Sequence, residues 1–232
     1  MMEKEAVAMQ VVAMLTIGQT PRADITGDLR RLLPEEVALR EYGALDGLSR
    51  AEAEALCGYE GTGELLVTRM AGQREMIRLS ADKIFARLQD CIHRAEAEGA
   101  QVHLMACTGN FPAYTHGAPI LYPGVCQREA ALQRGGPVGV LIPNEAQREQ
   151  IIGWWTECGA PDVQMAVADP FGPVEGVVAA ASALAEQGVQ VLCLDCFGFT
   201  LEQKEAAEEA TGLPVVLPRE VLCQMAKEEL YV

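Results

Sequence analysis

Two similar stretches decide the fold of this chain. Residues 95–111 read AEAEGAQVHLMACTGNF, and residues 184–200 read LAEQGVQVLCLDCFGFT. In one register Cys107 matches Cys196, and a glycine follows two residues after each cysteine. A glycine that ends a helix and a short apolar run after it are typical of a helix–strand unit. The repeat therefore predicts two equivalent strands, each ending at a cysteine.

The rest of the chain alternates apolar runs with amphipathic segments. The first run, 11–17, is continuously apolar, as in a parallel strand that is buried on both faces. Further strands are predicted at 37–42, 65–68, 102–106, 138–142, 163–167, 189–194 and 215–217. Strands that alternate with helices indicate an α/β fold with parallel sheets, whose ligands bind beyond the carboxyl ends of the strands.

Helix starts are marked by side chains that cap free amides. Ser49 with Glu52 and Thr200 with Gln203 form capping boxes. Thr20 before Pro21 predicts a third start, as N-cap and first helical residue. Longer helices are expected at 74–98, from Asn144 to about 158, at 179–187 and at 219–230, whereas 111–125 is expected to be a loop.

The alternation restarts after Gly135-Gly136-Pro137, which divides the chain into two predicted domains. The first α/β domain covers 1–134 and is completed by the C-terminal segment 214–232. The second covers 135–213. Cys107 and Cys196 then lie at the ligand-binding edges of their respective sheets.

The composition of the chain limits the kinds of partner that the protein is expected to bind. The chain has 232 residues, 50% of them hydrophobic, so it can bury a large core. It carries 18 Lys and Arg against 33 Asp and Glu, a formal charge of -15. Because this charge repels nucleic acid and anionic membranes, we expect neither as a partner. The N-terminus lacks a secretion signal, so we expect a cytoplasmic protein with reduced thiols; a homo-oligomer is left open.

Most of the cysteines are expected to pack as small hydrophobic residues. This interpretation applies to Cys57, Cys91, Cys126, Cys158, Cys193 and Cys223. Cys193 and Cys196 form a CxxC, but residues three apart in a strand point to opposite faces, and the three histidines lack ligand spacing. We expect no metal site. Dinucleotide and phosphate-loop glycine patterns are also missing from the sequence, so we expect no cofactor.

Two arginines are candidates for binding an anion. Arg22 is expected in the first turn of its helix, where a cation opposes the helix dipole, and it follows the loop 16–20. A carboxylate ligand would explain this placement, and a solvated surface arginine would explain it equally well. Arg69 follows the third strand and leaves the same two alternatives open.

Six separate motifs follow one another along the chain: LTIGQTPRADITGDLRRLLP, EYGALDGLS, LVTRM, CTGNFP, DCFGFT and LPRE. In this order, and from end to end of the chain, they resemble the motifs of the AroM family. That family is similar in turn to the aspartate/glutamate/hydantoin racemase superfamily. The resemblance implies two flavodoxin-like domains related by a pseudo-twofold axis, with a cofactor-independent site between them.

In the racemases one cysteine from each domain flanks the α-carbon of the substrate, and by position these would be Cys107 and Cys196. The sequence departs from the racemase pattern in two places. Phe197 stands where the racemases carry threonine and often histidine, and Gly18-Gln19-Thr20 replaces an acidic or serine residue after the first strand.

The mechanistic hypothesis is proton transfer on a small carboxylate. One thiolate would remove the α-proton, and the opposite thiol would protonate the other face. Loop amides and an arginine would hold the carboxylate and stabilise the enolate-like charge. The expected catalytic residues are Cys107 and Cys196. The expected binding residues are Thr16, Gly18, Gln19, Thr20, Arg22, Arg69, Thr108, Gly109, Asn110, Gly198 and Thr200.

Three alternatives remain at this point. A noncatalytic protein that binds a small carboxylate, or a regulatory protein, could keep the cleft without the chemistry. A cofactor-free decarboxylase is favoured by Phe197, which makes the second half-site narrower and more apolar. A structural protein would not use the cleft at all.

Overall fold

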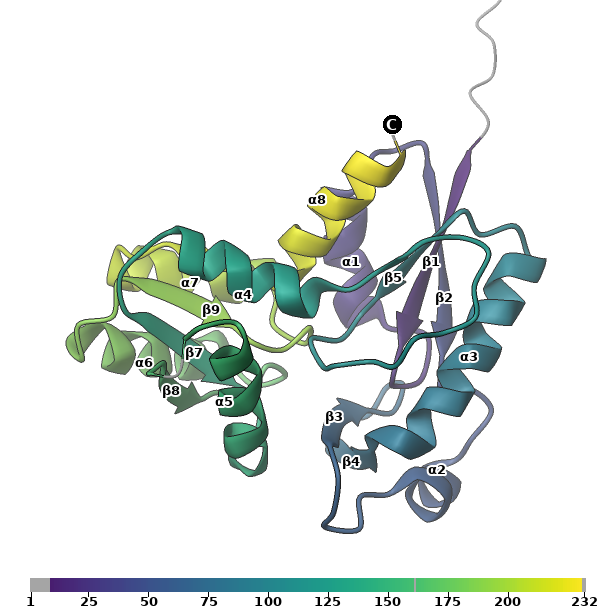
Figure 1. Cartoon of the computed structure of the whole chain (residues 1–232), viewed down its shortest axis with the longest axis horizontal. Helices are drawn as coiled ribbons and strands as arrows, with labels where there is room; N and C mark the ends of the chain where they lie inside the picture. Colours follow the sequence, from purple (N-terminus) through teal and green to yellow (C-terminus); the bar gives the residue numbers. More distant parts are fainter. Residues whose placement is uncertain (1–8, 161, 231–232) are drawn as a thin grey trace, which may run out of the picture.

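The computed structural model describes residues 9–160 and 162–230. Two parallel four-stranded sheets lie in separate lobes, each covered by helices (Figure 1). This mixed α/β architecture confirms the fold class expected from the alternation of strands and helices. Among the described helices, none is both long enough and apolar enough to cross a membrane.

The first sheet has the strand order β2-β1-β5-β6. Its central strand β1 pairs in parallel with β2 and with β5, so the apolar run after residue 9 is buried between neighbours. The strands are β1 (Gln10–Thr16), β2 (Val37–Gly43), β5 (Val102–Met105) and β6 (Ile120–Leu121).

The second sheet has the equivalent order β10-β9-β7-β8, with all neighbours parallel. Its central strands are entirely buried, as expected of strands covered on both faces. The strands are β7 (Val138–Ile142), β8 (Gln164–Val167), β9 (Val191–Leu194) and β10 (Val215–Val216).

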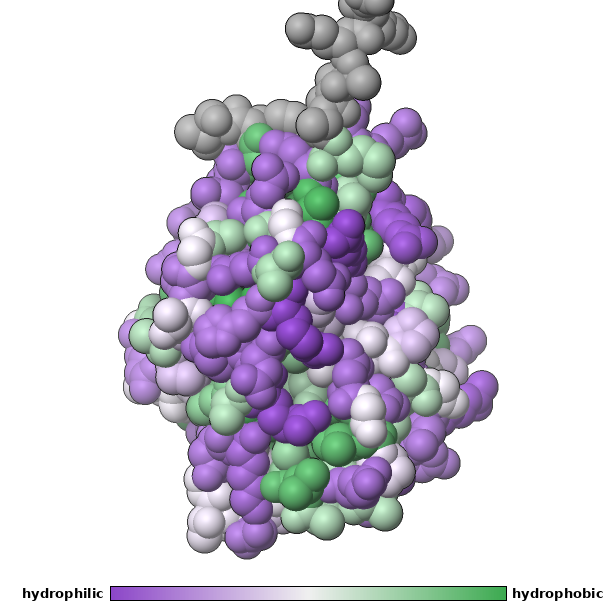
Figure 2. All heavy atoms as spheres, turned by 90° about the vertical axis from the view of Figure 1, so that its right-hand side faces the viewer, coloured by the Kyte–Doolittle hydropathy of each residue, from purple (hydrophilic) through white to green (hydrophobic). Residues whose placement is uncertain are grey.

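Helices cover both faces of each sheet. In the first lobe α2 and α3 pack on one face of β1, and α1 and α8 pack on the other. Hydrophilic side chains cover most of the outer face of this lobe (Figure 2). The helices are α1 (Ala23–Leu32), α2 (Arg50–Cys57), α3 (Ala81–Ala97), α4 (Pro123–Gln133), the 3-10 turn η1 (Glu145–Gln147), α5 (Arg148–Glu157), α6 (Val174–Glu186), α7 (Leu201–Thr211) and α8 (Pro218–Leu230).

The segment around residues 65–80 is an antiparallel hairpin, which the sequence did not predict. Strand β3 (Leu65–Arg69) pairs with β4 (Met76–Ser80) instead of joining a parallel sheet. The predicted helix over 74–98 therefore begins only at Ala81. Buried Ile77 and Leu79 flank exposed Arg78, which is the period of two that a half-buried strand requires.

Three of the four predicted helix starts are correct, among them Asn144, whose side chain accepts from the Ala146 amide at 3.0 Å and caps η1 ahead of α5. Both capping boxes form, with Ser49 capping α2 and Thr200 capping α7. The start at Thr20 is wrong, because its amide and hydroxyl bind the Asp46 carboxylate at 2.8 and 3.0 Å, and α1 begins at Ala23. The segment 111–125 is also not a loop throughout, since it contains β6 and the first turn of α4.

The C-terminal region is shared between the lobes. Helix α8 packs on α1 and β5 of the first lobe, whereas β10 pairs with β9 in the second sheet. Helix α4 contacts β9, β10 and α8. The division at residues 134 and 213 stays a prediction. In the structure β10 is the edge strand of the second sheet, and α4 packs against β9 and β10 of that sheet.

Candidate active site between the two sheets

The two cysteine loops leave their sheets in the same way. Ala106 and Asp195, one residue before each cysteine, donate their amides to the central strands β1 and β7 at 2.8 and 2.9 Å. Cys107 and Cys196 then donate to the last residue of their own strands at 2.8 and 2.9 Å. The duplication in the sequence is thus a duplication of backbone hydrogen bonds.

Both thiols line one small cavity at the interface between the lobes. The cavity has a volume of about 40 Å³ and is lined from the first lobe by Cys107, Thr108 and Gly109, and from the second by Asp195 and Cys196. This volume has room for only a few water molecules. The structure therefore brings the two predicted cysteines together in what we call the cysteine cavity.

Burial raises the pKa of both thiols. That of Cys107 rises to about 12 and that of Cys196 to about 11. The amides of Gly109 and Gly198 donate to the two sulfur atoms and act in the opposite direction, and the charge of Asp195 raises both pKa values further. Both thiols are therefore neutral at pH 7.

Asp195 lies beside the cavity and is only 2% exposed. Its carboxylate accepts hydrogen bonds from Gln127 Nε2 at 2.6 Å and from Trp155 Nε1 at 3.0 Å. Burial raises the pKa of Asp195, which these donors and the charge of Arg128 oppose. Sequence analysis missed this residue, although an acidic residue at the end of an apolar strand is an available signal.

Arg128, in the middle of α4, is a second residue that sequence analysis missed. It is 1% exposed, and its guanidinium lies 5.6 Å from the ring centroid of Trp154. Among the described residues, its Nε and Nη1 have no hydrogen-bond partner. No sequence signal was available, because the helix that carries it begins inside a segment expected to be a loop.

Arg22 and Arg69 are both engaged by Asp24. Arg22 binds this carboxylate through Nε at 3.0 Å and Nη2 at 2.8 Å, and Arg69 through Nη2 at 2.9 Å. Burial raises the pKa of Asp24, but the two arginines more than offset it and lower the pKa below its usual value. Arg22 is 4% exposed, so it is not a solvated surface arginine. Asp24 is thus the carboxylate partner of both arginines in this structure.

The remaining predicted binding residues lie in four places. Thr16, Gly18, Gln19 and Thr20 form contacts within the first lobe, with Thr16 Oγ1 accepting from Gly18 and Arg22, and Gln19 bound to Leu48. Gly198 and Thr200 line a separate pocket of about 210 Å³ that also contains Arg69. Gly109 and Asn110 line a third pocket, of about 410 Å³. Only Thr108 and Gly109 of the predicted binding residues line the cysteine cavity itself.

Within residues 9–160 and 162–230, no group of three or more His, Cys, Asp or Glu side chains could hold a metal ion. The CxxC cysteines differ in position, since Cys193 is buried within β9 and Cys196 lines the cavity.

The architecture is similar to that of known racemases. An allantoin racemase from Klebsiella pneumoniae is 11% identical with a TM-score of 0.64, over 95% of this chain and 87% of that one. An allantoin racemase from Pseudomonas fluorescens is 13% identical with a TM-score of 0.66, over 95% and 91%. A mutant of arylmalonate decarboxylase is 16% identical with a TM-score of 0.61, over 94% and 92%. At these identities the likeness shows the fold alone.

Among curated proteins, none matches the sequence. The family model described as AroM protein matches residues 12–230, which includes both cysteine loops, the β3–β4 hairpin and α8. The chain belongs to the AroM family.

Proposed function

We propose that this protein is a cofactor-independent enzyme of the racemase or isomerase type, in which one of Cys107 and Cys196 removes the α-proton of a small carboxylate and the other donates a proton to the opposite face. The observation that carries the proposal is the cysteine cavity, where two thiols from equivalent strand ends meet at the interface of two similar sheets. A pair of proton carriers on opposite sides of a substrate is what inversion at a carbon requires.

The chemistry needs one thiolate and one thiol. The thiolate takes the α-proton, and the electron pair of the C–H bond moves into the carboxylate to give an enolate. The opposite thiol then donates its proton to the other face of the carbon, so that the product is inverted and the two sulfur atoms have exchanged protonation states. Amides of Gly109 and Gly198, which donate to the two sulfurs, stabilise whichever thiolate is present.

The closed cavity is too small for such a substrate, so binding requires the lobes to separate. Several polar contacts cross the interface and would have to break or move. Gln150 binds the amide and the carbonyl of Leu65 at 2.8 and 3.1 Å, and Arg219 donates to the Phe197 and Gly198 carbonyls, both at 3.0 Å. Gln147 Nε2 donates to the Leu65 carbonyl at 2.9 Å, and the Arg69 guanidinium lies 4.3 Å from the ring centroid of Phe171. Opening would hydrate the sulfurs and lower their pKa, because burial is the main cause of the raised values.

A second function, cofactor-free decarboxylation, is favoured by the same pKa shifts. A neutral thiol is a poor base but a suitable acid, and the enolate formed when a malonate-type acid loses carbon dioxide needs only a proton donor. The thiolate left behind would recover its proton from water. Phe197, which is 3% exposed and lines the cavity, adds an apolar wall that disfavours a charged carboxylate and promotes its loss.

The test compares Cys107→Ser and Cys196→Ser in deuterium oxide. Candidate carboxylates are followed by NMR for exchange of the α-proton, and malonate-type acids for release of carbon dioxide. Cys158→Ser is the matched control, because this cysteine is also partly buried but lies at the end of α5, outside the cavity. Loss of exchange in both cavity variants supports the racemase. Loss of decarboxylation in only one variant supports the decarboxylase, and unchanged rates in both overturn the proton-transfer proposal.

A further inference from the structure

The two halves of the protein carry different residues at one equivalent position. In each half a helix begins with a proline, two residues after the edge strand that pairs with the cysteine strand. Pro123 begins α4 after β6, and Pro218 begins α8 after β10. The next residue is Gly124 in α4 and Arg219 in α8. The equivalence of the two half-sites therefore ends at this position.

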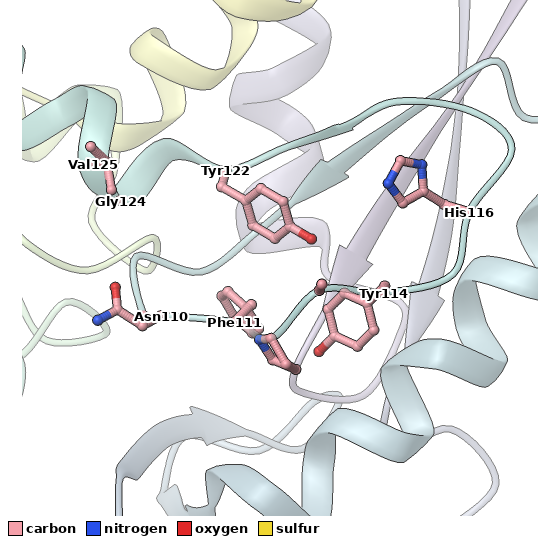
Figure 3. A pocket seen from close by; sticks show the side chains of 10 residues that line it. Asn110, Phe111, Tyr114, His116, Tyr122, Gly124 and Val125 are labelled. Atoms are coloured by element: carbon pink, nitrogen blue, oxygen red, sulfur yellow. The ribbon is translucent and has the colours of Figure 1, made fainter.

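Gly124 lies against the loop of the first cysteine and brings no side chain to it. A Cβ on Gly124 would be 2.6 Å from the carbonyl oxygen of Thr108, the residue after Cys107. Figure 3 shows Gly124 in the first turn of α4, next to Val125. The backbone of α4 thus approaches this carbonyl so closely that the first half-site has no room for a side chain there.

Arg219 fills the equivalent position in the second half with a guanidinium. Its Nε and Nη2 donate to the carbonyls of Phe197 and Gly198, the two residues after the second cysteine, both at 3.0 Å. Nη1 donates to the Asp28 carboxylate at 2.6 Å and to the Asp24 carbonyl at 2.8 Å. Arg219 is 0% exposed, and each of its three guanidinium nitrogens has a protein acceptor. It therefore acts through the cysteine loop and does not touch a substrate.

A single peptide group connects this guanidinium to the second sulfur. The carbonyl of Phe197 accepts from Arg219, and the N–H of the same peptide group, that of Gly198, donates to Cys196 Sγ at 3.4 Å. A cation at the oxygen of a peptide group polarises the group and strengthens the hydrogen bond that its N–H donates. Because a thiolate accepts such a bond more strongly than a thiol, the arrangement favours ionised Cys196.

The charges around Cys196 include two cations. Burial raises the pKa of this thiol to about 11, and the charge of Asp195 raises it as well. Arg22, at the start of α1, and Arg219 lower it. The guanidinium of Arg219 thus acts on Cys196 both through the peptide group and through its charge.

The charges that act on Cys107 are acidic. Burial raises the pKa of this thiol to about 12, and the carboxylates of Glu64 and Asp195 raise it further. The two half-sites therefore differ in the same direction in their charges and in their backbone contacts, and a thiolate is less unfavourable at Cys196.

We propose that Arg219 is a positioning residue for the reaction, which aims the Gly198 amide at Cys196 so that the thiolate of the pair forms at Cys196 and the proton stays on Cys107. The proton of Cys196 leaves to water before the substrate is enclosed. Cys196 then removes the α-proton, the electron pair of the C–H bond moves into the carboxylate, and Cys107 protonates the opposite face. This order of steps rests on the proposed function, whereas the effect of Arg219 on Cys196 stands on the contacts.

The test is the rate of alkylation by iodoacetamide at pH 8 in the whole protein, read separately at Cys107 and Cys196 by mass spectrometry. Arg219→Gln should slow alkylation of Cys196 about 10-fold, the change for one unit of pKa, and leave Cys107 unchanged. Arg219→Lys keeps the charge but cannot span both carbonyls, so its rate should lie between those of the parent and Arg219→Gln. Arg31→Gln is the matched control: Arg31 also lies near Asp28, at 3.9 Å, but is 66% exposed, and both rates should stay unchanged.

A purely structural role for Arg219 predicts the opposite sign. Loss of its contacts would then loosen the loop, hydrate the sulfur of Cys196 and speed its alkylation. Faster or unchanged alkylation of Cys196 in Arg219→Gln would overturn the proposal, as would equal slowing at both cysteines. The parent protein provides a check that holds even where Arg219→Gln does not fold. Its Cys196 should begin to react at lower pH than Cys107, and coincident or reversed pH profiles would also overturn the proposal.

Positioning and chemistry are separated by the exchange assay in deuterium oxide. If alkylation of Cys196 depends on Arg219 while no carboxylate exchanges its α-proton in the parent protein, the positioning role stands and the proposed function fails. If carboxylates exchange and Arg219→Gln leaves the alkylation of Cys196 unchanged, the function stands and the positioning role fails. Where both hold, Arg219→Gln should lower kcat for exchange with little change in KM, because Arg219 acts on the sulfur and not on the bound substrate.

Discussion

Trp155 donates its indole Nε1 hydrogen to the carboxylate of Asp195 at 3.0 Å, in the layer directly behind the cysteine cavity. Trp155 is fully buried and Asp195 is 2% exposed. The hydrogen bond therefore fixes the position of the Asp195 carboxylate, which directly precedes Cys196 in the sequence. Its charge raises the pKa of both Cys196 and Cys107. This charge opposes the formation of either thiolate.

Asp195→Asn should lower the pKa of both cavity thiols, because it removes the carboxylate that disfavours a second negative charge. The measurement is the pH dependence of iodoacetamide labelling at Cys107 and Cys196, read by mass spectrometry. Labelling should begin at lower pH than in the parent protein. The asparagine amide satisfies one of the two donors and not the other, so we also expect a stability loss of about 1–3 kcal/mol. An unshifted labelling profile would contradict the role of this charge.

The raised thiol pKa values also predict how stability depends on pH. A thiol whose pKa is higher in the folded than in the unfolded protein keeps its proton up to a higher pH in the folded state. The contribution of such a thiol to folding stability is complete below the ordinary pKa of 9.0. It is lost as the pH rises toward the folded-state pKa, about 12 for Cys107 and about 11 for Cys196. The free energy of unfolding should therefore fall between pH 9 and 11, and fall less in the double serine variant. Urea titrations at each pH measure the difference, and parallel curves would contradict it.

How far the sequence predicts this protein depends on whether the signal is local. The parallel sheets, the two cysteine strand ends and two capping boxes follow from short-range patterns, and the structure contains them. The β3–β4 hairpin was missed because Ile77 fits a helical spacing as well as an alternating one. Short apolar runs leave this ambiguity, and tertiary pairing resolves it.

The charged part of the site could not be predicted for a different reason. Arg22 and Arg69 were expected to bind an external anion, but Asp24 lies where it can bind both. Conversely, nothing local distinguishes Arg128 from a surface arginine until α4 is seen to pack against β9 and β10. The Arg22–Asp24 pair is local, but the contact between Asp24 and Arg69 and the burial of Arg128 are long-range properties of the fold that no sequence spacing encodes.

Asp24→Asn should destabilise the protein, because Arg22 is buried and loses its charged partner. We expect a loss of about 2–4 kcal/mol, which lies between the values for exposed and for fully buried ion pairs. The pKa of Asp24 is lowered in the folded protein, so its contribution is present above the ordinary value of 3.8 and is lost as the pH falls below it. In urea unfolding, the stability difference between Asp24→Asn and the parent protein should be smaller near pH 3 than at pH 7. Glu35→Gln, at an exposed acid, is the control, and an equal loss in both variants would contradict the assignment.

Gly124→Ala tests the junction between α4 and the first cysteine loop. A Cβ on Gly124 would lie 2.6 Å from the carbonyl oxygen of Thr108, so the helix start must move away from the loop. We expect a stability loss of about 1–3 kcal/mol, as in other overpacked sites. Gly153→Ala in α5 is the matched control: its Cβ would meet nothing within 4 Å, and alanine should stabilise the helix by up to about 1 kcal/mol. The same Gly→Ala change is made at both positions. A loss at Gly124 beside a gain at Gly153 in urea unfolding would support the contact with Thr108, and equal signs would show that α4 does not depend on this close approach.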